Sequence, residues 1–203
     1  MFFSAFFLGL SSSYVGTIAP SMLNITATKI SLEKSKKTAI NYAIGVSSIA
    51  VFQAFFALLF LKAIHSSPFI INTLQSIAII IFSMLSIFFF RKAIQEQKKI
   101  ITKKRIQSGF LTGVGLSLIN MFSIPFYCAV GATFNMYDWL QLDLTSISFF
   151  VLGSGIGTYF ILHHYVLLAE KIKPKIARFS KYLNFILGTI TGIVALGSFI
   201  KLL

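Results

Sequence analysis

The sequence predicts an all-α integral membrane protein with six transmembrane helices. Hydrophobic residues make up 56% of the 203 residues and charged residues only 11%, and the mean hydropathy is +0.85. Soluble domains carry roughly 25% charged residues. Six apolar stretches also reach the roughly 20 residues that a helix needs to cross the hydrocarbon core. These stretches are Phe2–Ala27, Thr38–Ile64, Phe69–Phe90, Gly109–Met136, Leu144–Ala169 and Tyr182–Leu203.

Charge predicts the orientation of these segments. The loops 28–37, 91–108 and 170–181 hold 16 of the 18 lysines and arginines. Basic loops face the cytoplasm in multi-pass membrane proteins. We therefore expect these three loops to be cytoplasmic and both termini to lie outside. In this setting the net charge of +13 indicates membrane orientation and not nucleic-acid binding.

The first segment contains an irregular stretch from Gly16 to Asn24 that includes Pro20 and Ser21, and Ser13 precedes it. Proline donates no backbone hydrogen bond, and its ring clashes with the carbonyl four residues earlier. Lipid cannot satisfy that carbonyl, so such a break is tolerated where it faces protein or a wet cavity. The polar residues predict either the lining of a solute pathway or hydrogen bonds that join helices.

The fourth segment repeats this theme with Asn120 and Pro125. An asparagine inside a membrane is costly unless it is paired. Asn120 is expected either to bridge to the first segment or to contact the solute.

The fifth segment offers a small-residue face and two histidines. At 100° per residue Gly153, Gly157 and His164 share one helix face, and small residues there let helices approach closely. We therefore expect His164 to point into the helix bundle and His163 to point away. Histidine changes its charge near neutral pH, so His164 is a candidate for proton coupling, with a neutral hydrogen-bonding role as the alternative.

The loop 91–108 divides residues 1–203, expected to form one membrane domain, into halves 1–90 and 109–203. Each half has three segments, so halves with the same fold would be inverted relative to each other. Phe7-Leu8 matches Phe110-Leu111, Pro20 matches Pro125, and Gly45 matches Gly153, at offsets of 103, 105 and 108. Inverted repeats with broken helices in corresponding positions indicate a transporter site near the midplane. We therefore predict a 3+3 inverted repeat with proline-broken first and fourth helices.

The pattern of titratable residues excludes several chemistries. All five acids lie in loops or at segment ends, so none is placed to neutralise a cation at the midplane. One cysteine and three histidines make few ligands for a metal ion. There is no Ser-His-Asp set, HExxH motif or phosphate loop. We therefore expect no catalytic residues, no metal site, no cofactor and no enzymatic activity.

Six segments in about 200 residues, a proline-broken first segment, a basic first loop, Gly45 in the second segment and Asn120 in the fourth resemble the LysE (lysine exporter, RhtB-type) translocators. The resemblance implies a transporter in the bacterial inner membrane that exports amino acids or related small metabolites, driven by an ion gradient. The family often has an aspartate shortly after the glycine of its second segment, but this chain has Ser47 and Ser48 there. A neutral or zwitterionic solute therefore fits better than a cationic one.

We therefore predict an exporter that works by alternating access, with a small solute and the lipid bilayer as partners. The oligomeric state is left open, a homo-oligomer included. Two alternatives are a non-transporting subunit that binds another membrane protein and a divalent-metal exporter. The residues expected to form the pathway are Ser13, Gly16, Pro20, Ser21, Asn24, Gly45, Asn120, Pro125, Gly153 and Gly157.

Overall fold

The computed structural model describes residues 2–19, 21–65, 83, 86–87, 91, 108–120, 122–171, 189, 192–193 and 196. The chain divides into two compact units, Met1–Ala63 with Arg105–Pro174 and Ile64–Lys104 with Lys175–Leu203. Almost all described residues belong to the first unit. The predicted segments 69–90 and 182–203, most of the loops 91–108 and 170–181, and Pro20 lie outside the described residues.

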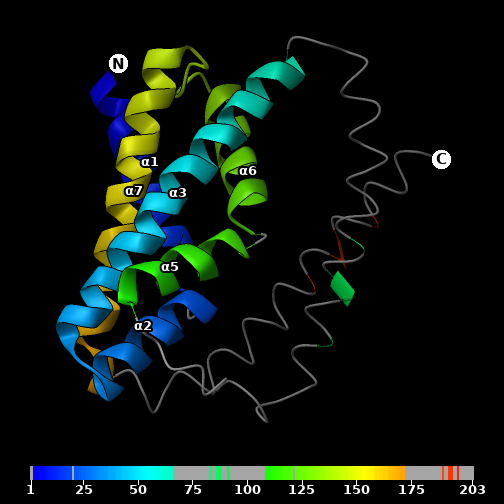
Figure 1. Ribbon diagram of the computed structural model, residues 1–203. Coiled ribbons are helices and arrows are strands. Elements are labelled where there is room, and N and C mark those ends of the chain that lie inside the picture. The colour runs from blue at the N-terminus through cyan, green and yellow to red at the C-terminus, as the bar shows by residue number, and fades with distance from the viewer. Residues whose placement is uncertain are drawn as a thin grey trace. The chain divides into compact units, whose positions relative to one another are not determined.

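The described residues form helices and contain no strand (Figure 1). The helices are α1 (Phe2–Gly16), α2 (Met22–Glu33), α3 (Lys36–His65), α5 (Gly109–Leu118), α6 (Ser123–Met136) and α7 (Leu144–Leu167). Both α3 and α7 are long and apolar enough to cross a membrane. The pair of α5 and α6 is bent by 67° and makes a third span if it is counted as one.

The predicted segments agree with these helices in the second, fourth and fifth positions. The first segment forms two helices, and its second helix continues past Ala27 to Glu33. The prediction of a loop over 28–37 was therefore wrong, because only two residues separate α2 from α3. Leu23, Ala27 and Ile30 are buried at helical spacing, so the apolar face of α2 extends into the stretch whose lysines suggested a loop.

The two helix breaks occupy residues 17–21 and 119–122. The second break lies before Pro125, which is the third residue of α6. A proline is compatible with the first turn of a helix, where its missing N–H has no partner to lose. Its ring also prevents α6 from extending upstream. Pro125 therefore fixes where α6 begins and does not interrupt it.

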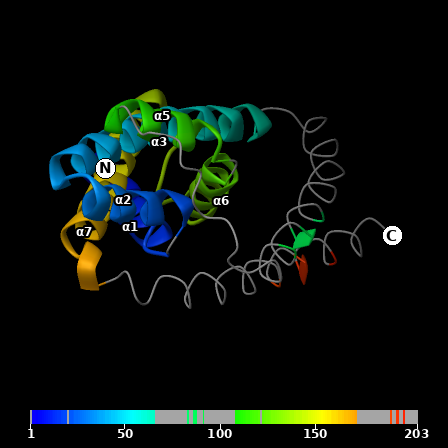
Figure 2. The same ribbon diagram turned by 60° about the horizontal axis from the view of Figure 1, so that its bottom comes forward.

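Two helix crossings with direct backbone contact hold the first unit together. At the crossing of α1 with α7, a Cβ on Gly9, Gly153 or Gly157 would overlap a carbonyl oxygen of the facing helix. At the crossing of α3 with α5, the same holds for Gly45, Gly109 and Gly113. In both views α5 lies along α3 (Figures 1 and 2). Glycine is required at these positions because the facing backbone occupies the space of a side chain.

The two crossings use the same set of contacts. The Phe6 carbonyl meets Gly153, and the Phe110 carbonyl meets Gly45. Likewise, Gly9 meets the Phe150 carbonyl, and Gly113 meets the Tyr42 carbonyl. Residues of α1 match residues of α5 at a constant offset of 104, from 6 to 110 and from 9 to 113. Residues of α3 match residues of α7 at an offset of 108. In the contacts the offset between α1 and α5 is therefore 104, one residue more than the offset of 103 at which Phe7-Leu8 matched Phe110-Leu111 in the sequence.

The helix α7 begins at a side-chain cap. Asp143 Oδ1 accepts hydrogen bonds from the backbone N–H groups of Thr145 and Ser146, both at 3.0 Å. The Ser146 hydroxyl, followed by the Ser146 backbone N–H, lowers the pKa of the Asp143 carboxyl below its usual range. These bonds fix the start of the helix that carries the glycines of the first crossing.

We predict opposite effects of alanine at two neighbouring glycines of α5. Gly113→Ala places a methyl group against the Tyr42 carbonyl, so it should lower the free energy of unfolding by about 1–3 kcal/mol. Gly115 has no atom within 4 Å of an added Cβ, so Gly115→Ala is the matched control. It should be neutral or stabilising, because alanine is the better helix former. Thermal unfolding of the purified protein in detergent measures both, and equal shifts would contradict the close crossing.

The cap of α7 should make stability depend on pH. Because the folded pKa of Asp143 is lowered, its carboxylate stabilises the fold above the ordinary pKa of about 3.9. This stabilisation is lost as the pH falls through the lowered folded value. Asp143→Ala should cost about 1 kcal/mol at pH 7. Asp143→Asn keeps an acceptor without the charge, so its difference from wild type should vanish on acidification. A difference that persists in acid would contradict this assignment.

Candidate functional site at the helix breaks

The first break is held by side chains that satisfy its backbone. Asn24 Nδ2 donates to the carbonyls of Thr17 and Ala19 at 2.6 and 2.8 Å. The Tyr165 hydroxyl donates to the Ile18 carbonyl at 2.8 Å. Three successive carbonyls that α1 and α2 leave without helical partners are thus satisfied from α2 and α7. Such partners are required because a membrane interior supplies no water for them.

The second break is held in a related way from α3. Gln53 Nε2 donates to the Ser117 carbonyl at 2.9 Å, and the Ser117 hydroxyl donates to the Val46 carbonyl at 3.5 Å. Asn120 closes the break locally, since its Nδ2 donates to the Ser123 hydroxyl at 2.9 Å and its Oδ1 accepts from the Phe122 N–H at 3.4 Å. The hydrogen bonds described for Asn120 therefore stay within its own segment and do not reach the first one.

A buried hydroxyl cluster joins α1, α6 and α7 beside the first break. Ser13 is fully buried, and its hydroxyl lies 2.7 Å from that of Thr158 and 2.9 Å from that of Tyr127. One turn later, the ring of Phe126 occupies the space that a side chain on Gly16 would need. The last turn of α1 thus packs on the first turn of α6. This contact brings the upstream end of the first break to the downstream end of the second.

The predicted pathway residues divide into two groups. Ser13, Gly16, Ser21 and Asn24 surround the first break, and Asn120 and Pro125 belong to the second. Gly45, Gly153 and Gly157 instead lie in the helix crossings, where facing backbone fills the space next to them. Ser21 and Pro125 are exposed. The sequence interpretation did not identify Gln53, Tyr127, Thr158 and Tyr165 as site residues, although Thr158 directly follows Gly157 on the helix.

The orientation predicted for the two histidines was wrong. His164 is exposed, and its Nδ1 lies 3.4 Å from the Tyr14 hydroxyl. His163 is half-buried and stacks on Tyr159, with ring centroids 5.7 Å apart. The reason is the length of α1. Gly157 contacts Leu10, so the same face seven residues later lies beyond Gly16, where α1 has already ended.

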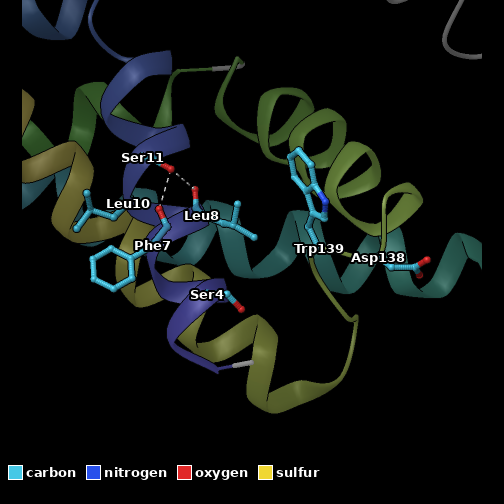
Figure 3. A pocket seen from close by; sticks show the side chains of 7 residues that line it. All are labelled: Ser4, Phe7, Leu8, Leu10, Ser11, Asp138 and Trp139. Atoms are coloured by element: carbon cyan, nitrogen blue, oxygen red, sulfur yellow. Dashed lines mark hydrogen bonds between the residues drawn. The ribbon is translucent and has the colours of Figure 1, made fainter.

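Two pockets lie away from the breaks. One of about 560 Å³ is lined by α1 and the loop after α6, including Leu8 and Trp139 (Figure 3). The Asp138 carboxylate points away from α1 in this view, and the Ser11 hydroxyl is bonded to its own helix. The other pocket, of about 300 Å³, lies between α3 and α7. Neither pocket is lined by residues of the two breaks, so neither is the predicted pathway.

Apolar helices long enough to cross a membrane and breaks sealed by side chains define a multi-pass membrane protein. Comparison with known families assigns it further. The family model described as LysE type translocator matches residues 14–202, and the chain belongs to that family. It is therefore a membrane transport protein for amino acids or similar solutes. No curated protein and no solved structure matches the chain.

We predict that the Tyr165 hydroxyl contributes to stability through the first break. Tyr165→Phe keeps the buried ring but leaves the Ile18 carbonyl without its donor, so it should cost about 1–3 kcal/mol of unfolding free energy. Tyr137→Phe is the matched control, because Tyr137 is 57% exposed. Thermal unfolding in detergent measures both variants. A Tyr165→Phe protein as stable as the control would show that the break needs no such donor.

Proposed function

We propose that this protein exports neutral or zwitterionic amino acids, or related small metabolites, across the bacterial inner membrane, with both termini outside and the basic stretches 28–37, 91–108 and 170–181 at the cytoplasmic side. Six transmembrane helices form two inverted halves, and alternating access between the halves moves the solute. An ion gradient drives the cycle. The family supports solute transport, and the particular mechanism rests on how the two breaks are built.

The observation that carries this proposal is the matched construction of the two breaks. In each half, the first helix of the broken segment crosses the long helix of the other half, α1 on α7 and α5 on α3. Each long helix also donates a side chain to a carbonyl at or beside a break, Tyr165 to Ile18 within the first break and Gln53 to Ser117 in the last turn of α5, although the offset of 108 does not relate these two donors. Constant offsets of 104 and 108 relate the two crossings. Broken helices in corresponding positions of two repeats mark transporter sites.

The division of the chain into units also supports two equivalent halves. The first unit takes the first two predicted segments of each half, and the second unit takes the third. Corresponding segments of the two halves therefore belong to the same unit. Within the described residues the two breaks differ in detail, because side chains cap three carbonyls of the first break, whereas Gln53 reaches the Ser117 carbonyl in the last turn of α5 beside the second.

The charges of the described helices favour a zwitterionic solute. The acids of the described residues are Glu33, Asp138, Asp143 and Glu170, and all lie in loops or at helix ends. The Ser21 side chain makes no cap bond at the start of α2, which follows the first break. The first N–H groups of a helix attract negative charge, so this start suits a solute carboxylate.

For coupling to a proton gradient, His164 offers the titratable group. Its ring packs edge-to-face on Tyr14 in the last turn of α1, with centroids 5.9 Å apart. Tyr14 lies one residue from the buried Ser13 cluster. Protonation of His164 would therefore add a positive charge next to the first break, where α1 ends.

Exchange in proteoliposomes tests the proposed function. Vesicles holding the purified protein and loaded with unlabelled leucine, threonine or lysine are diluted into the labelled amino acid. We expect accumulation of leucine or threonine well above that of lysine and above protein-free vesicles. A cooperatively unfolding protein that exchanges none of them would contradict transport and favour the non-transporting subunit. Exchange of lysine alone would contradict the neutral pathway.

A further inference from the structure

Two amide side chains at the breaks carry a buried oxygen without a hydrogen-bond partner. Four buried side-chain polar atoms of the described residues lack one: Asn24 Oδ1, Gln53 Oε1, Asp143 Oδ2 and His163 Nδ1. The first two belong to the side chains that hold the breaks. Asn24 is fully buried and Gln53 is 8% exposed. Buried polar groups are nearly always paired, so an unpaired acceptor at each break points to a missing partner.

The direction of both amide oxygens is fixed by the backbone. Asn24 Nδ2 is held by two carbonyls of the first break, and Gln53 Nε2 is held by the Ser117 carbonyl. A rotated amide would set its oxygen against those carbonyl oxygens, two acceptors with no proton between them. Each oxygen therefore faces away from the carbonyl that its own amide group satisfies. The missing partner must be a hydrogen-bond donor.

We propose that Asn24 Oδ1, at the first break, and Gln53 Oε1, beside the second, each accept a hydrogen bond from the ammonium group of the transported solute. This inference rests on the proposed function and specifies the chemistry of its site. An ammonium group carries three donors and no acceptor. Its charge strengthens a hydrogen bond to a neutral acceptor. Each acceptor therefore fits the ammonium group of an amino acid, whereas a helix start attracts the carboxylate.

The position of Asn24 allows a single helix turn to bind both charged groups of a zwitterion. Asn24 is the third residue of α2, and the Ser21 side chain makes no cap bond there. The oxygen that would accept from the ammonium group thus belongs to the same first turn whose N–H groups attract a carboxylate. An α-amino acid carries its two charged groups on one carbon, and a single helix turn can bind both. Gln53 presents the same acceptor beside the last turn of α5.

Competition by solute fragments tests this inference with the full chain in proteoliposomes. The best exchanged neutral amino acid of the panel above is the labelled solute. Competitors are the same amino acid, its deaminated acid and its decarboxylated amine. In the wild type we expect the amino acid to compete at least tenfold better than the deaminated acid, because a buried acceptor rejects a solute that leaves it unpaired.

Variants at the two amides separate this role from a structural one. In Asn24→Leu and in Gln53→Met the tenfold preference should fall to less than about threefold. Gln53→Glu in its protonated form keeps both a donor for Ser117 and an acceptor oxygen, so it should retain the preference. The control is Thr133→Val, because the Thr133 hydroxyl is exposed and bonds within α6.

Three results would decide the matter. If Asn24→Leu fails to fold, Gln53→Met decides, because it leaves the first break intact. Folded variants that exchange the amino acid and keep the wild-type preference would overturn the inference, and a buried water would then be the partner of these oxygens. No exchange by the wild type would overturn the proposed function and this inference together. Loss of preference in the amide variants alone supports both.

Discussion

The structure depends on one constraint, that the backbone carbonyls of a helix break inside a membrane must find donors within the protein. In water such a break would cost little, because solvent would bond the exposed groups. In hydrocarbon each unsatisfied group costs several kcal/mol. The side chains of Asn24, Tyr165 and Gln53 therefore belong to the backbone architecture as much as to any pathway. Their placement explains why α7 and α3 must lie where they do.

The glycine crossings supply that placement. Gly157 contacts Leu10, and the two helices run in the same direction. Eight residues further along the chain from each of these two residues, Tyr165 on α7 is level with Ile18 in the first break, whose carbonyl it caps. A side chain in place of Gly157 would separate the helices and withdraw the hydroxyl from the break. Packing and hydrogen bonding are thus coupled at the first break, because loosening the crossing of α1 with α7 would expose the Ile18 carbonyl.

The helical class, the long helices α3 and α7 and the position of both breaks could be predicted from the sequence. Apolar length and proline placement are local properties, and they need no knowledge of neighbours. The orientation of His164 could not, because it depends on where α1 ends opposite it. The side chains that donate to the carbonyls at the breaks could not be predicted either. Gln53 and Tyr165 lie in other segments, and only the helix register shows which carbonyl each one meets.

The same limit applies to Asn24, whose residue type suggested a pathway and whose contacts show a structural duty as well. Its nitrogen is committed to the break, and only its oxygen is left for a solute. A neutral amide suits a carrier that must also close when it is empty. A carboxylate in its place would need a cation at every step, since an unpaired buried charge is far costlier than an unpaired amide oxygen. An amide can therefore bind a zwitterion in one state and remain buried without it in another.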